Sequence, residues 1–180
     1  MADGSDRLEV AIILVNEGYA STAVGPLEVF AASVAMWNEL FGAQPEPLFR
    51  ATTASIDGRP VESAYGLRNA PNCAIADLGP VDLVMVSASG PVPEDWMSRH
   101  AALPEWLRGR YEAGTIVAGV CSGVALLAKA GLLDGRRATT HWGVVEAFRA
   151  RYPNVHWCTD LLITKDAGLY LRNARKLVMP

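Results

Sequence analysis

The run Leu8–Val15, with the sequence LEVAIILV, is the feature that most restricts the fold of this chain. Apart from Glu9, every residue in the run is apolar, and several are β-branched. A strand with one face in water alternates apolar and polar side chains, whereas a strand covered on both faces is almost continuously apolar. The run therefore predicts a strand inside a sheet that other elements cover on both sides.

Other segments fit such a sheet. Further strands are predicted at Leu48–Ala54, Asp82–Val86 and Thr115–Val120. Between the strands, apolar residues recur at helical spacing, and proline suits a first helical turn. Helices are therefore predicted to begin at Gly25-Pro26 and to occupy Pro104–Ala113, Ser122–Leu133 and Val144–Tyr152. Strands alternating with helices predict one α/β domain, residues 1–180, a three-layer sandwich with a mainly parallel sheet and helices on both faces.

The remaining segments are less regular. Polar and small residues predict loops at Asn16–Thr22 and Ser87–Pro93, each at the C-terminal end of a strand. A short hairpin with a loop is predicted within Val61–Asp77, an extended piece at Ala138–Thr140, and one or two strands within Asn154–Thr164.

Composition and charge argue against several functions. The net charge is −3, without a basic stripe, so this segment is a poor candidate for binding nucleic acid by itself. Three cysteines do not make a disulfide framework and fit a reduced cytoplasmic setting. No secretory signal and no apolar run of the ~20 residues that span a bilayer is present, so no membrane association is expected. Neither a Cys/His cluster with ligand spacing nor a glycine-rich phosphate loop is present, so no metal or cofactor is expected.

The segment Gly119-Val120-Cys121-Ser122-Gly123 joins a predicted strand directly to a predicted helix. Such a connection forces its central residue into a tight turn with small neighbours, the geometry of a nucleophile elbow. A helix N-terminus stabilises a thiolate, and the N–H of Ser122 could bind an oxyanion beside the sulfur. The alternative is a cysteine that packs as a small apolar residue, but its setting favours a special site.

Two motifs support a resemblance to a known family. The stretch Gly131–Trp142 reads GLLDGRRATTHW, and Gly25–Phe30 reads GPLEVF. Together with the Cys121 turn, they resemble the ThiJ/PfpI (class I glutamine-amidotransferase-like) superfamily, and most of all the domain found in AraC-type transcriptional regulators. The matches extend from Leu8 to about Tyr170.

The resemblance implies a flavodoxin-like fold and a set of site residues. Cys121 would be the elbow thiol, and His141 would lie near it as a base or hydrogen-bond partner. Glu28 is interpreted mainly as a structural carboxylate near the positive end of its helix. The ligand pocket implied by the resemblance comprises Thr22, Glu28, Ser89, Gly90, Cys121, Ser122, His141 and Trp142.

The sequence departs from the family pattern at three places. The first two argue against efficient catalysis, and the third concerns the C-terminal end. Enzymes of the superfamily carry a carboxylate four residues before the helix proline, where this chain has Thr22. They often carry Gly-Gly in the loop that here reads Ser87-Ala88-Ser89-Gly90. The segment Leu171–Pro180 lacks the family's small-residue turn and final helix, so the C-terminal end is expected to be truncated or altered.

The leading hypothesis is a ligand-sensing and dimerisation domain of an AraC-type regulator, most consistent with a non-catalytic role because of Thr22. Its expected partners are an unidentified small molecule, a second copy of the chain, and DNA only through a C-terminal domain absent from this chain. The alternative is a cysteine-dependent hydrolase, hydratase or amidotransferase-like enzyme in which Cys121 attacks a carbon and His141 moves the proton. A third hypothesis treats Cys121 as a redox sensor.

Overall fold

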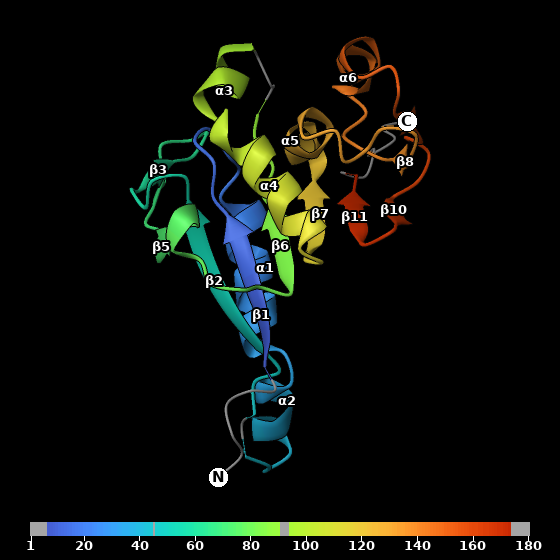
Figure 1. Ribbon diagram of the computed structural model, residues 1–180. Helices are drawn as coiled ribbons and strands as arrows, with labels where there is room; N and C mark the ends of the chain where they lie inside the picture. The colour runs from blue at the N-terminus through green and yellow to red at the C-terminus, as the bar shows by residue number, and fades with distance from the viewer. Residues whose placement is uncertain (1–6, 45, 91–93, 174–180) are drawn as a thin grey trace, which may run out of the picture.

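The computed structural model describes residues 7–44, 46–90 and 94–173 of the chain. A seven-stranded sheet forms its centre, in the order β10-β11-β7-β6-β1-β2-β5 (Figure 1). Neighbouring strands are parallel except for β10 and β11, which are antiparallel. The strands are β1 (Leu8–Ile13), β2 (Phe49–Ser55), β5 (Cys73–Ala74), β6 (Leu83–Val86), β7 (Ile116–Val120), β10 (Ile163–Asp166) and β11 (Leu169–Arg172).

Helices cover both faces of the sheet. On one face, α1 (Ser21–Ala32) packs against β1 and β2. The other face carries α4 (Ala102–Glu112) and α5 (Val124–Lys129), with α3 (Glu94–Arg99) before them. The smaller elements are α2 (Ala35–Leu40), α6 (Val145–Arg151), the hairpin of β3 (Val61–Glu62) and β4 (Arg68–Asn69), and the pair β8 (Arg137–Ala138) and β9 (His156–Trp157).

The alternation of side chains along β1 explains the apolar run that begins the chain. Ala11 and Ile13 belong to the core beneath α4 and α5, whereas Val10 and Ile12 belong to the core beneath α1. All four are buried. The α/β sandwich, its mainly parallel sheet and the position of β1 inside it are therefore confirmed.

Some element boundaries differ from the sequence-based expectations. The first helix begins at Ser21, so Pro26 lies inside it instead of opening it. Backbone bonds from Thr22 N–H to Tyr19 O and from Val24 N–H to Ala20 O show that the chain is already helical before the proline. Pro26 has no N–H to give, so α1 loses one internal bond at that point.

The apolar residues at helical spacing from Leu27 to Trp37 predicted one continuous helix, whereas the chain breaks at Val34 and the separate short helix α2 follows. The short helix α3 was not predicted, and the helix after the elbow ends at Lys129 instead of Leu133. The expectation that the C-terminal end is truncated or altered falls mainly on residues 174–180, outside the described residues. None of the helices in the described part of the chain is long and apolar enough to cross a membrane.

Candidate functional site

Cys121 occupies a strained turn at the C-terminal end of the strand β7. The strand ends at Val120, and a short 3-10 turn, Cys121–Gly123, leads into α5. The φ angle of Cys121 is 55°, in the left-handed region that residues with a side chain rarely adopt. Such a conformation costs about 1–3 kcal/mol and persists only where the surroundings enforce it.

The close approach of strand β6 explains the glycine that follows the elbow. A Cβ atom on Gly123 would lie 2.4 Å from the carbonyl oxygen of Ser87, at the end of β6. A Cβ atom on Gly119 would meet side-chain atoms alone, the nearest being Val124 Cγ2 at 3.2 Å. The requirement for a small residue is therefore strict at Gly123 and weaker at Gly119.

Two side-chain contacts fix the elbow to neighbouring segments. The hydroxyl of Thr140 donates a hydrogen bond to the carbonyl oxygen of Cys121 at 2.8 Å. The hydroxyl of Ser122 accepts a bond from the N–H of Ser89 at 3.1 Å and donates one to the Ser89 carbonyl oxygen. The elbow, the loop after β6 and the segment before α6 therefore form one connected unit.

Thr22 links the start of α1 to the loop after β6. Its hydroxyl donates to the carbonyl oxygen of Tyr19 at 2.7 Å and accepts the N–H of Ala88 at 3.0 Å. The N–H of Tyr19 also donates to the carbonyl oxygen of Ala88 at 2.8 Å. Both hydrogen-bonding functions of the Thr22 hydroxyl therefore serve the backbone, and a hydroxyl cannot exchange a proton near neutral pH as a carboxylate does.

The environment of Cys121 disfavours the thiolate. Burial raises the pKa of the Cys121 thiol, and hydrogen bonds from the backbone and side chain of Ser122 oppose that rise only in part. No charged group contributes to the shift. Burial therefore disfavours the thiolate, the form of cysteine that acts as a nucleophile and is oxidised most readily.

The structure shows where the other expected site residues lie. Ser89, Gly90 and Ser122 lie together beside the elbow, and the N–H of Gly90 donates to Glu17 O at 3.2 Å. His141 accepts the N–H of Gly143 at its Nδ1 atom, 3.0 Å away. Its ring centroid lies 5.1 Å from that of the exposed Trp142. Among the described residues, no hydrogen bond joins His141 to Cys121.

Glu28 does not belong with this group. It is exposed and lines a groove between α1 and α2, together with Val29 and Trp37. Because α1 begins at Ser21, Glu28 also lies in the second half of that helix, away from its positive end. The interpretation of Glu28 as a helix-start carboxylate is therefore wrong, because the start of the helix was placed too late.

Thr140 is the contact that sequence reasoning missed. The motif Gly131–Trp142 drew attention to its histidine, yet the threonine before that histidine makes the bond to the elbow. No group of three metal-binding side chains occurs in the part of the chain that the structure describes.

Comparisons with known proteins identify a family and proteins with similar sequences or folds. A family model described as the DJ-1/PfpI family matches residues 9–169. The transcriptional regulator CdhR of Pseudomonas aeruginosa is 38% identical over 114 residues, covering 63% of this chain and 33% of the regulator. The chain thus matches about a third of the length of that relative.

Two further matches represent a regulator and an enzyme. The crystal structure of an AraC family transcriptional regulator from Pseudomonas putida superposes with a TM-score of 0.72 at 22% identity, covering 92% of this chain and 83% of that one. At this identity the match shows the fold alone. An isonitrile hydratase of Pseudomonas putida is 35% identical over 86 residues, covering 46% of this chain and 36% of the enzyme.

Proposed function

Because the chain belongs to the DJ-1/PfpI family, we propose that it is the ligand-sensing and dimerisation domain of an AraC-type transcriptional regulator. The observation that carries this proposal is the setting of Cys121: burial raises the pKa of its thiol, and Thr22 binds the backbone of the loop after β6 where enzymes of the family carry a carboxylate. Similarity to the regulator CdhR supports it. The protein would act in the cytoplasm and reach DNA through a separate domain.

The sensing site would lie at the C-terminal ends of the parallel strands, where open α/β sheets bind ligands. Ser89, Gly90, Cys121 and Ser122 would form its floor, with His141, Trp142 and Thr22 around it. The ligand would be a small molecule, held by hydrogen bonds to the loop after β6 and by contact with the exposed indole of Trp142.

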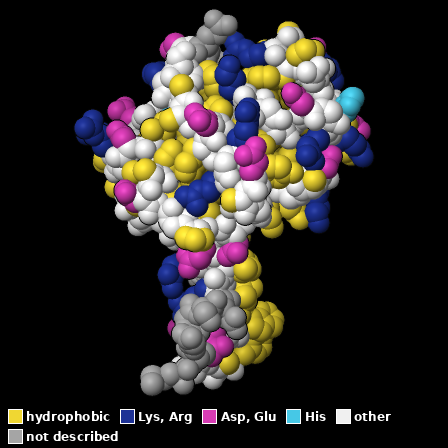
Figure 2. All heavy atoms as spheres, in the orientation of Figure 1, with side chains coloured by type: hydrophobic (Ala, Val, Ile, Leu, Met, Phe, Trp, Pro, Cys, Tyr) yellow, Lys and Arg dark blue, Asp and Glu magenta, His cyan; other side chains and the backbone are white. Residues whose placement is uncertain are grey.

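The dimer would form through an exposed apolar surface on α1 and α2. This α1–α2 apolar surface consists of Val29, Met36, Trp37, Leu40 and Phe41, which are 58–72% exposed. Figure 2 shows hydrophobic side chains gathered along one side of the projecting segment, where Figure 1 places α2. Five large side chains at this exposure present about 500 Å² of apolar area. That area approaches the ~800 Å² that each partner buries in a standard interface.

A second copy of the chain is the partner that fits this surface. A twofold axis brings the same patch of both subunits together, so the apolar surface of one copy packs against the identical apolar surface of the other. The groove between α1 and α2, about 440 Å³ and lined by Val29 and Leu40, offers a place for a side chain of the partner.

The sensing function is tested by measuring the unfolding temperature of the chain against a panel of small metabolites. A compound bound at the site should raise that temperature, and Trp142→Ala should reduce the shift. Ile163→Ala, which removes a similarly exposed side chain on β10, should leave the shift unchanged. If no compound raises the unfolding temperature and the chain is also monomeric at micromolar concentration, the proposal fails.

An enzyme is the second candidate, and the similarity to isonitrile hydratase favours it. Cys121 would attack an electrophilic carbon, with the N–H of Ser122 beside the developing negative charge. The neutral thiol and the engaged hydroxyl of Thr22 count against this reaction. Incubation with isonitriles should give no product above that of Cys121→Ser, and a Cys121-dependent turnover would replace the sensor proposal. The same raised pKa counts against a redox sensor.

A further inference from the structure

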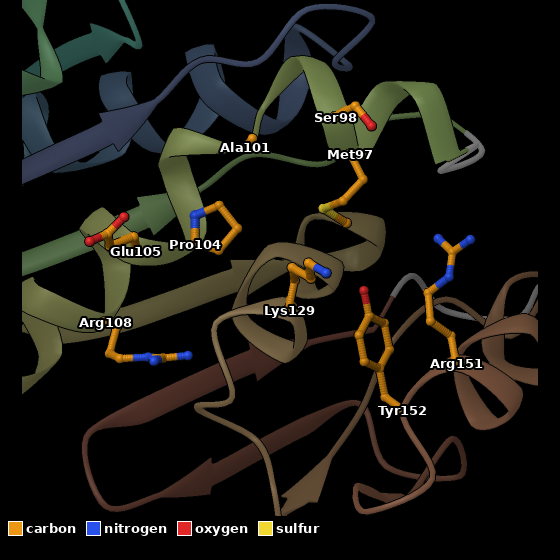
Figure 3. A pocket seen from close by; sticks show the side chains of 9 residues that line it. All are labelled: Met97, Ser98, Ala101, Pro104, Glu105, Arg108, Lys129, Arg151 and Tyr152. Carbon is orange, nitrogen blue, oxygen red and sulfur yellow. The ribbon is translucent and has the colours of Figure 1, made fainter.

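A groove on the face opposite to α1 lies between helices that come from distant parts of the sequence. It has a volume of about 790 Å³ and lies among α3, α4, α5 and α6 (Figure 3). We call it the α4–α6 groove. The residues that line it include Met97, Pro104, Arg108, Lys129, Arg151 and Tyr152. Its volume lies within the ~300–1,000 Å³ that is typical of small-molecule sites.

The charge of the groove differs in sign from that of the protein. Three cations line it, Arg108 from α4, Lys129 from α5 and Arg151 from α6, against the single acid Glu105. The whole chain carries a net charge of −3. A local excess of positive charge around a concave surface raises the local concentration of small anions.

Arg108 is held in a fixed direction. Its Nε atom donates to the carbonyl oxygen of Ala130 at 2.8 Å, which anchors the side chain just beyond the end of α5. Neither Arg108 nor Lys129 forms an ion pair with any residue that the structure describes. A guanidinium anchored through Nε still has terminal N–H groups, and their planar arrangement matches the oxygens of a carboxylate or a phosphate.

Tyr152 forms one wall of the groove. Figure 3 shows its ring directed toward Lys129 and Met97. Its Oη atom is buried, so the ring closes the groove at this side and its hydroxyl is not offered to a ligand. Burial raises the pKa of the Tyr152 phenol, and the charge of Arg151 and a side-chain hydrogen bond with it oppose this rise.

We propose that the α4–α6 groove binds a small organic anion. Arg108 and Lys129 would attract its carboxylate or phosphate group, and its apolar part would lie against Met97 and Pro104. This site is separate from the Cys121 elbow, and the proposal does not rest on a sensing function there. The two regions lie at opposite ends of α5, which begins after the elbow turn and ends at Lys129.

Isothermal titration with four probes tests the proposal: benzoate, phenyl phosphate, inorganic phosphate and benzyl alcohol. We expect at least one of the two aromatic anions to bind more tightly than inorganic phosphate, because inorganic phosphate has no apolar part. Benzyl alcohol, which lacks a charge, should not bind measurably. The comparison of benzoate with phenyl phosphate identifies which oxyanion the groove prefers. Higher salt should weaken binding, since the cations are largely exposed.

Matched variants show where the anion binds. The double variant Arg108→Gln/Lys129→Gln should raise the Kd at least tenfold, and each single variant should raise it by a smaller factor because one cation remains. Arg59→Gln, which removes an exposed cation elsewhere, should have no effect. Cys121→Ala should also leave the Kd unchanged, which separates this site from the elbow.

The proposal is overturned if neither aromatic anion saturates the protein below 10 mM, on the order of the weakest useful affinity for a small ligand. It is also overturned if Arg59→Gln weakens binding as much as the double variant, because the attraction would then be nonspecific. Unfolding midpoints of all variants identify any that fail to fold, and the single variant Lys129→Gln, at an exposed side chain, remains as a test in that case.

Discussion

At the scale of single residues, the elbow combines a strained backbone with an unactivated thiol. Cys121 adopts a positive φ, and its carbonyl oxygen is held by Thr140. The strained turn holds the Cys121 sulfur at the C-terminal ends of the strands. A reactive thiol would also need a positively charged or basic neighbour, and none contributes to the pKa shift of Cys121.

The first prediction concerns the pH dependence of Cys121 alkylation. Because burial raises its pKa, the rate of reaction with iodoacetamide should reach half its maximum above the pH of ~8.5 expected for a free cysteine. Mass spectrometry of peptides distinguishes Cys121 from Cys73 and Cys158. A midpoint near or below pH 7 would show an activated thiol and restore the enzyme and redox hypotheses.

The second prediction concerns the glycine after the elbow. Gly123→Ala should destabilise the protein by about 1–3 kcal/mol or more, since its Cβ atom would overlap the carbonyl oxygen of Ser87. Gly109→Ala is the matched control, because a Cβ atom there meets nothing within 4 Å inside helix α4. It should stabilise by about 0.5–1 kcal/mol. Urea unfolding measures both, and equal effects would contradict the close approach of β6 to the elbow.

At the scale of elements, the junction between α3 and α4 contains a buried histidine. His100 is 2% exposed, its ring stacks on Trp96 at 4.2 Å, and its Nδ1 atom lies 2.7 Å from the Trp96 carbonyl oxygen. Burial lowers the pKa of His100 and Arg99 adds to this effect, whereas the hydrogen bond with the Trp96 carbonyl and the charge of Glu17 oppose it. The folded state therefore favours the neutral ring.

The third prediction follows from that histidine. Its folded pKa lies below the ordinary 6.5, so the unfolded state binds more protons in the interval between the two values. Stability should be full above about pH 6.5 and should fall as the pH decreases through that interval. His100→Asn, whose amide can donate to Trp96 O, should flatten this part of the stability profile measured by urea unfolding. An unchanged slope would assign the dependence to other groups.

The sequence predicts the sheet better than the helices, for physical reasons. The apolar run in β1 fits only a strand that is buried on both faces. The turn at Gly119–Gly123 fits only a tight strand–helix connection, because the backbone of β6 lies close to Gly123. The start of α1 was misplaced because proline suits a first helical turn, although Tyr19–Thr22 bonds form a helix earlier. The break at Val34, with φ of 66°, was not predicted because helical spacing continues through it to Trp37.

The candidate site was predictable in part. A strand–turn–helix pattern locates Cys121, and the resemblance to the family implies that His141 lies near it in space. Their roles were not readable, because the choice between Thr140 and His141 as the partner of the elbow depends on side-chain direction. The α4–α6 groove carries no sequence signal, since its cations come from separate helices and meet only after folding.

At the scale of the whole molecule, the fourth prediction is that the chain dimerises through α2. Sedimentation at micromolar concentration should show a dimer, and Leu40→Glu should convert it to a monomer by placing a charge in the apolar surface. Leu162→Glu, which charges another exposed leucine before β10, is the control and should leave the dimer intact. A monomeric wild type, or a dimer that Leu40→Glu does not affect, would contradict the assignment of this surface.

The position of α2 has a consequence for how two subunits would respond to a signal. The helix α1 begins near the C-terminal ends of the strands, where the elbow lies. The helix α2, which follows it, lies beyond the opposite ends of the strands, at the bottom of Figure 1. Subunits joined through α2 therefore hold their Cys121 sites at the far ends of the assembly, without direct contact between the sites. Coupling between them would then require a conformational change carried through α1 and α2 across the interface. Without such a change, a titration would follow a hyperbola with a Hill coefficient of about 1, and the dimer would report a graded signal.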